Sequence, residues 1–88
     1  MQLLRELCEA PGVAGREERI REIVKKRAKR YVDDISLDSM GNLIALKKAK
    51  ASKARKPQRV MLACHMDEIG FYVKHVDDKG YIRVVPLG

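Results

Sequence analysis

One short motif in the 88-residue sequence has the residue types of metal chemistry, His65-Met66-Asp67. On an extended backbone, residues two apart point to the same side, so the Asp67 carboxylate can approach the His65 imidazole. A carboxylate in that place fixes the tautomer of the imidazole and raises its basicity as a metal ligand. A His-x-Asp triplet also arises often by chance, and a histidine that ends a strand is commonly just hydrogen-bonded. The motif therefore predicts either a metal ligand with its orienting carboxylate or a plain hydrogen-bonded pair.

The other candidate side chains near the motif have simpler interpretations. His75 belongs to a predicted strand that alternates with solvent-facing residues, so we expect a surface histidine. Glu68 is either a second carboxylate of the site or a surface acid. Cys64 directly precedes His65, but adjacent strand residues face opposite ways, so its thiol should lie in the core and not act as a nucleophile beside the imidazole. With only Cys8 as a second cysteine, we expect two buried thiols and neither a disulfide scaffold nor a cysteine zinc site.

The element that must position the motif is the uninterrupted apolar run directly before it, Val60-Met61-Leu62-Ala63-Cys64. Such a run is typical of a strand covered on both faces at the middle of a sheet. The motif would then lie at the carboxyl end of this strand, where open α/β sheets collect their binding groups. After it, residues 69–76 and 81–85 predict a hairpin that turns at Asp77-Asp78-Lys79-Gly80.

The first half of the chain predicts two helices and a second hairpin. Leucines at helical spacing from Leu3 onward predict a short helix that ends at Pro11-Gly12. An apolar stripe predicts a second helix from Arg16 to about Tyr31. Residues 31–38 and 43–46 then predict two strands joined by a turn at 39–42. Residues 47–57 predict a basic loop, because they are polar and have no hydrophobic period.

The positive charge is concentrated in two stretches of the chain. The sequence has 19 Lys and Arg against 12 Asp and Glu, a net charge of +7. Residues 16–30 hold eight of these basic side chains, and residues 47–56 hold six more with no acid among them. Such clusters can contact the phosphates of nucleic acid or of a membrane surface. Because no aromatic residues are interleaved with them as single-strand binders require, we expect solvated surfaces and neither a nucleic-acid nor a membrane partner.

The expected location is the cytoplasm. The sequence contains no run of about 18 apolar residues, so we expect no transmembrane helix. The first residues also lack the basic-then-apolar pattern of a signal peptide.

Four segments, taken in order, resemble one family of enzymes. They are Glu6–Glu18 with the run Pro11-Gly12-Val13-Ala14-Gly15, Gly41–Ala45, Met61–Phe71, and Pro86-Leu87-Gly88. Together they look like the N-terminal part of the glutamyl or deblocking aminopeptidases, two-metal peptidases that include TET-type particles and proteins called cellulase M or FrvX. The resemblance covers nearly the whole chain and is more specific than a His-x-Asp triplet.

The fold that this resemblance implies is the N-terminal part of a three-layer α/β/α domain with a mixed sheet, incomplete within these residues. Residues 1–88 would be the N-terminal segment of the catalytic metallopeptidase domain, with 47–57 as a basic loop.

The resemblance also implies roles for two residues. His65 matches the first metal-ligand histidine of the family, and Asp67 matches the catalytic-site carboxylate that orients it. In these enzymes two divalent ions, zinc or cobalt, polarise the scissile carbonyl and activate a water, while a glutamate acts as general base. Glu68 does not match that glutamate, and the remaining ligands match sequence beyond Gly88. We therefore expect at most one partial metal site here, and an inactive chain when these residues are isolated.

The partners implied by the resemblance are peptide substrates, the rest of the catalytic domain and further copies in a homo-oligomer. The alternative function is a non-catalytic basic module for binding or assembly.

Overall fold

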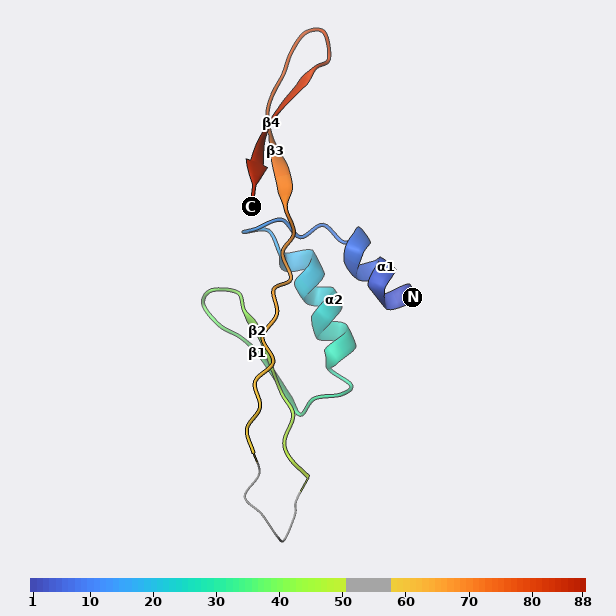
Figure 1. Ribbon diagram of the computed structural model, residues 1–88, viewed down its shortest axis with the longest axis vertical. Helices are drawn as coiled ribbons and strands as arrows, with labels where there is room; N and C mark the ends of the chain where they lie inside the picture. The colour runs from blue at the N-terminus through green and yellow to red at the C-terminus, as the bar shows by residue number, and fades with distance from the viewer. Residues whose placement is uncertain (51–57) are drawn as a thin grey trace. The chain divides into compact units, whose positions relative to one another are not determined.

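The computed structural model describes residues 1–50 and 58–88 (Figure 1). Its elements in chain order are α1 (Gln2–Glu9), α2 (Glu18–Ala28), β1 (Asp34–Leu37), β2 (Leu43–Leu46), β3 (Gly70–Val76) and β4 (Ile82–Leu87). The chain divides into two compact units. The first unit comprises Met1–Arg21 with Met66–Gly88, and the second comprises Glu22–His65.

In the first unit, a short helix and a hairpin come from opposite ends of the chain. Helix α1 ends at Glu9, and the next residue, Ala10, has an extended backbone with φ −78° and ψ 127°. This agrees with the sequence, because the residue before a proline is driven out of the helical region and Pro11 follows. Strands β3 and β4 pair antiparallel from Gly70↔Leu87 to Val76↔Ile82, with an irregularity between Val73 and His75. The predicted hairpin is confirmed.

The second unit contains the other predicted hairpin. Strands β1 and β2 pair antiparallel from Asp34↔Leu46 to Leu37↔Leu43. Helix α2, which runs from the first unit into the second, has Glu18 in its first turn and Lys25, Lys26 and Arg27 in its last. This order of charges suits the helix dipole. The helix is shorter than the predicted span of Arg16 to about Tyr31, but its place in the chain is as expected.

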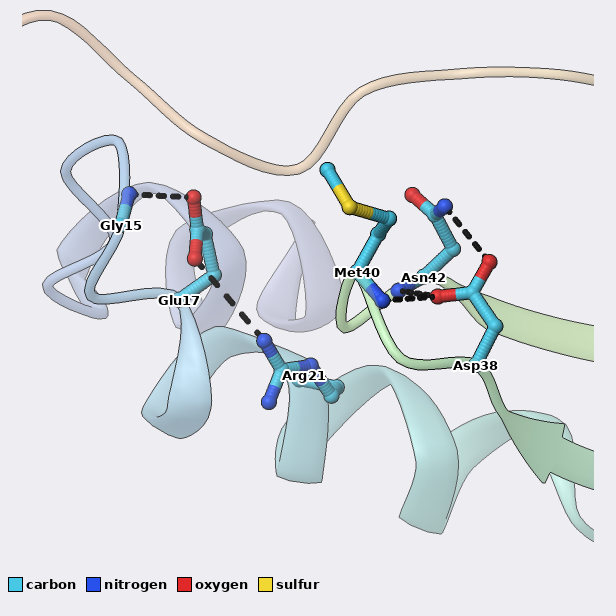
Figure 2. Close-up of polar contacts among 6 residues, drawn as sticks. All are labelled: Gly15, Glu17, Arg21, Asp38, Met40 and Asn42. Carbon is cyan, nitrogen blue, oxygen red and sulfur yellow. Dashed lines mark hydrogen bonds and ion pairs between the residues drawn. The ribbon is translucent and has the colours of Figure 1, made fainter.

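The loop between β1 and β2 is organised by one carboxylate, that of Asp38 (Figure 2). It accepts hydrogen bonds from the backbone N–H groups of Met40 at 2.9 Å and Asn42 at 2.8 Å. The Asn42 side-chain amide donates a third bond, also at 2.8 Å. These donors, led by the Asn42 side chain, hold the pKa of Asp38 below its usual value of 3.8, because they favour the charged carboxylate.

The loop between β3 and β4 repeats this arrangement. Asp77 accepts from the backbone N–H groups of Lys79 at 3.0 Å and Tyr81 at 2.9 Å. In both loops the fourth residue is a glycine with positive φ, 83° at Gly41 and 85° at Gly80. Glycine takes this conformation without a Cβ clash. The two hairpins therefore share the same kind of turn, Asp-x-x-Gly, in which the aspartate carboxylate accepts backbone N–H groups of the turn.

Buried side chains are few among the described residues. Ala10, at 9% exposure, and Ile20, at 4%, are buried together with Gly12, and all three belong to the first unit. The predicted buried thiols are wrong for this chain, since Cys8 and Cys64 are both exposed. So little of the described chain is packed into a core that neither thiol is enclosed.

The predicted central strand at Val60–Cys64 is also wrong for this chain by itself. No strand is formed there, and Val60, Met61 and Leu62 are 81%, 88% and 92% exposed. A strand needs a neighbour to pair its backbone groups, and the described sheets are limited to β1 with β2 and β3 with β4. The apolar run is therefore a segment whose pairing partner is not among the described residues.

The predicted basic loop at 47–57 is only partly described. Residues 47–50 have no regular structure, and the remainder, 51–57, lies outside the described residues. At the start of this loop, the Asp33 carboxylate accepts from the Lys48 backbone N–H at 2.7 Å and lies 3.9 Å from Lys47 Nζ.

Candidate metal site

The candidate residues occupy the chain directly after the apolar run. His65 is exposed, and Asp67 is half-buried. Glu68 is exposed, and its backbone takes part in a contact with the N-terminal region. His75 lies on β3 opposite Arg83 and is exposed, which confirms its prediction as a surface histidine.

The backbone around Asp67 is held by the segment after α1. The Glu68 N–H donates to the Gly12 carbonyl oxygen at 2.8 Å, and Val13 and Glu68 form an isolated parallel bridge. This contact joins residues far apart in the sequence within the first unit. The sequence does not reveal this contact, because Pro11-Gly12 indicates only the end of a helix.

A tight turn follows the same segment. The Arg16 N–H donates to the Val13 carbonyl at 2.8 Å, and the Gly15 N–H donates to Glu17 Oε1 at 2.6 Å (Figure 2). The other oxygen of Glu17 lies 3.8 Å from Arg21 Nη2 across one helical turn. The Glu17 carboxylate thus links this turn to the first turns of α2.

The described residues offer single metal donors and not a complete site. Within residues 1–50 and 58–88 there is no group of three or more His, Cys, Asp and Glu side chains that could hold a metal ion. A zinc site takes about four donors. The chemistry of the His65 imidazole and the Asp67 carboxylate suits zinc or cobalt, so these two residues could supply at most one part of a metal site.

Comparison with known proteins relates this chain to one family of enzymes. The sequence profile of the M42 glutamyl aminopeptidase family matches residues 41–88, which include His65-Met66-Asp67. The chain belongs to the M42 glutamyl aminopeptidase family. The lysyl aminopeptidase of Pyrococcus furiosus is 43% identical over 88 residues, covering 99% of this chain and 24% of the relative.

Solved structures of aminopeptidases extend the likeness to the fold. An aminopeptidase from the archaeon Desulfurococcus kamchatkensis matches with a TM-score of 0.84 and 32% identity, over 99% of this chain and 23% of that one. A TET aminopeptidase from a marine-sediment Thaumarchaeota archaeon matches with a TM-score of 0.81 and 31% identity, over 100% of this chain and 23% of that one. The chain thus spans about a quarter of the length of the M42 relatives it matches. The expected incomplete α/β fold is confirmed.

Neither helix in the described part of this M42 chain has the length and apolar character needed to cross a membrane.

Proposed function

We propose that residues 1–88 form the N-terminal segment of the catalytic domain of a metal-dependent aminopeptidase. The observation that carries this proposal is the family match over residues 41–88, because it includes the one motif with metal-ligand chemistry. The aminopeptidase names of the relatives supply the reaction, which is removal of N-terminal residues from peptides.

In this proposal His65 is a metal ligand and Asp67 is the carboxylate that orients it. His65 is an exposed residue, and imidazole nitrogen is a ligand that suits zinc and cobalt. Asp67 would accept the N–H of the other ring nitrogen, which would fix the tautomer of the imidazole and raise its basicity as a ligand. When bound, two zinc or cobalt ions supply Lewis-acid activation of the scissile carbonyl and of the attacking water.

The complete enzyme then needs groups that these residues do not provide. The other ligands and the general base come from the rest of the catalytic domain, which is a partner of this segment. The name of the TET neighbour supports a homo-oligomeric assembly acting on peptides. We further propose a cytoplasmic location.

The test is metal dependence of the complete enzyme that contains this chain. The purified enzyme is stripped with a chelator and assayed with leucine, glutamate and lysine anilides before and after zinc or cobalt is added. Hydrolysis should disappear on stripping and return with metal. Full activity in the stripped enzyme would refute the metal role. Absence of any hydrolysis, together with salt-sensitive binding to nucleic acid, would favour the basic binding module instead.

A further inference from the structure

The best-packed part of the described chain includes Gly12, which lies beside the peptide groups that flank Asp67. Its three buried residues, Ala10, Gly12 and Ile20, all belong to the first unit, as Asp67 does. Most of the large apolar side chains elsewhere in the described chain are exposed. In a closely packed region, even a small increase in side-chain volume displaces the neighbouring atoms.

Gly12 contacts the chain on both sides of Asp67. Its carbonyl oxygen accepts the Glu68 N–H at 2.8 Å. A Cβ built on Gly12 would lie 3.4 Å from the Met66 carbonyl oxygen and 2.9 Å from Ile20 Cγ2. Of the two peptide groups that flank Asp67, the one after it is thus hydrogen-bonded to Gly12, and the one before it lies close to the same residue.

Gly70 gives Val13 the room that this contact needs. A Cβ on Gly70 would meet Val13 Cγ1 well inside van der Waals contact and would lie 3.4 Å from Val13 Cβ. Val13 is β-branched, so its side chain cannot easily turn away. The parallel bridge between Val13 and Glu68 therefore depends on residue 70 being a glycine, which has no side chain.

The need for glycine at these two positions is spatial. Four of the six glycines, at 15, 41, 80 and 88, have positive φ, whereas Gly12 and Gly70 do not. Alanine could adopt the backbone at 12 and 70 but has no space for its methyl group.

We propose that Gly12 is a positioning residue for Asp67, and that Gly70 maintains this role by letting Val13 lie against the chain after the metal motif. The inference rests on the proposed function of His65 and Asp67 and deepens it. A shift of the Met66 and Glu68 peptide groups would rotate the Asp67 carboxylate away from the ligand that it orients, and so weaken metal binding without removing a donor.

The test compares three glycine-to-alanine variants in the complete enzyme. Gly12→Ala and Gly70→Ala change the contact, and Gly80→Ala is the matched control, because a Cβ there meets nothing within 4 Å and only the turn backbone is strained. Zinc and cobalt affinities are measured by titration of the stripped enzyme and expressed per folded protein. We expect Gly12→Ala and Gly70→Ala to weaken metal binding about 10-fold or more, the range seen when groups that orient a ligand are lost. Gly80→Ala should bind metal like the parent.

A rescue variant separates positioning from general destabilisation. Val13→Ala removes the methyl group that meets residue 70, so the double variant Val13→Ala/Gly70→Ala should recover metal affinity to within about threefold of the parent, a coupling that independent sites would not show. Excess metal should restore the turnover number of Gly70→Ala. If Gly70→Ala does not fold, the double variant carries the test, and a metal affinity still 10-fold below the parent would overturn the proposal.

A measurement without metal distinguishes failure of this inference from failure of the proposed function. Hydrogen exchange in residues 66–70 of the stripped enzyme should be faster in Gly12→Ala and Gly70→Ala than in Gly80→Ala. A parent enzyme that binds no metal would refute the proposed function. The hydrogen-exchange rates of residues 66–70 would still test whether Gly12 and Gly70 maintain the contact with this segment. If the parent binds metal through His65, yet all three variants bind it equally well at equal folded fraction, the positioning role is wrong.

Discussion

At the scale of single residues, the two members of the metal motif should differ in the size of their effects. His65→Ala in the complete enzyme removes a donor, so metal content and hydrolysis should both be lost at ordinary metal concentrations. Asp67→Asn keeps the shape of the side chain but weakens the basicity of the ligand, which typically costs about 10- to 100-fold in metal affinity or activity. Excess zinc or cobalt should partly rescue Asp67→Asn. Elemental analysis beside the hydrolysis rate checks both variants.

The matched control for this prediction is the other histidine. His75→Ala changes an exposed position on β3, and exposed substitutions of this kind alter stability by about 0.5 kcal/mol or less. It should keep parental metal content and rate. Loss of metal in His75→Ala, with full metal and rate in His65→Ala, would move the site away from the end of the apolar run and would require a new assignment of the family motif.

At the scale of elements, the Asp38 loop predicts a pH dependence of the β1–β2 hairpin. The pKa of Asp38 is lowered in the folded loop, chiefly by the Asn42 side-chain amide. A group with a depressed folded pKa adds stability above its unfolded pKa and loses it as pH falls through the folded value. The hairpin loop should therefore keep its structure down to pH 3.8 and loosen only below that value. NMR titration of the Met40 and Asn42 amide protons measures the midpoint.

The matched variant for the loop is Asn42→Ala, which removes the side-chain donor but keeps the backbone one. Its titration midpoint should move upward, toward the ordinary aspartate value, because the largest cause of the lowered pKa is gone. A parental midpoint at or above 3.8, or no difference between parent and variant, would contradict the assigned role of Asn42.

The elements that the sequence predicted well are those decided by local interactions. The end of α1 follows from Pro11, and both hairpins follow from short turns with a glycine. The same Asp-x-x-Gly spacing occurs at Asp38 and at Asp77 and can be seen in the sequence. The spacing alone does not show that both carboxylates accept backbone N–H groups of their turns.

What the sequence could not supply depends on contacts far along the chain. An apolar run such as Val60–Cys64 predicts a buried strand. Whether that strand forms depends on a neighbouring strand, which local spacing does not identify. The contact of Gly12 with Glu68 is of the same kind, since a backbone hydrogen bond leaves no mark on either residue type. For the metal site, a His-x-Asp triplet located the two candidate residues, and only the family likeness raised them above chance.

At the scale of the whole molecule, the exposed apolar surface predicts self-association of the 88-residue chain. The run at Val60–Leu62 is more than four-fifths exposed, and an apolar segment with unpaired backbone invites pairing with another chain. The net charge of +7 opposes this, but salt screens it. Sedimentation velocity should show species larger than a monomer, increasing with concentration and with salt. A sharp monomer that unfolds cooperatively would show instead that these residues are a self-sufficient domain.

A pair of charge variants assigns this association to the apolar run. Leu62→Lys places a charge in the run and should reduce the association, because charged side chains protect exposed strands from pairing. Gln58→Lys adds the same charge at an exposed position just outside the run and is the control. An equal reduction in both variants would mean that net charge, and not the apolar run, governs the association.

The last prediction is that the 88-residue chain by itself hydrolyses no aminoacyl substrate. Each of two ions needs about four donors, whereas residues 1–50 and 58–88 contain no group of three or more His, Cys, Asp and Glu side chains that could hold a metal ion. A single imidazole with its carboxylate binds zinc or cobalt too weakly to hold the ion in place, and no second ion can be held beside it. Leucine and glutamate anilides should therefore show no turnover with either metal added. Turnover that survived repurification and was lost in His65→Ala would contradict this, because these residues would then have to complete the site themselves, through association of several copies.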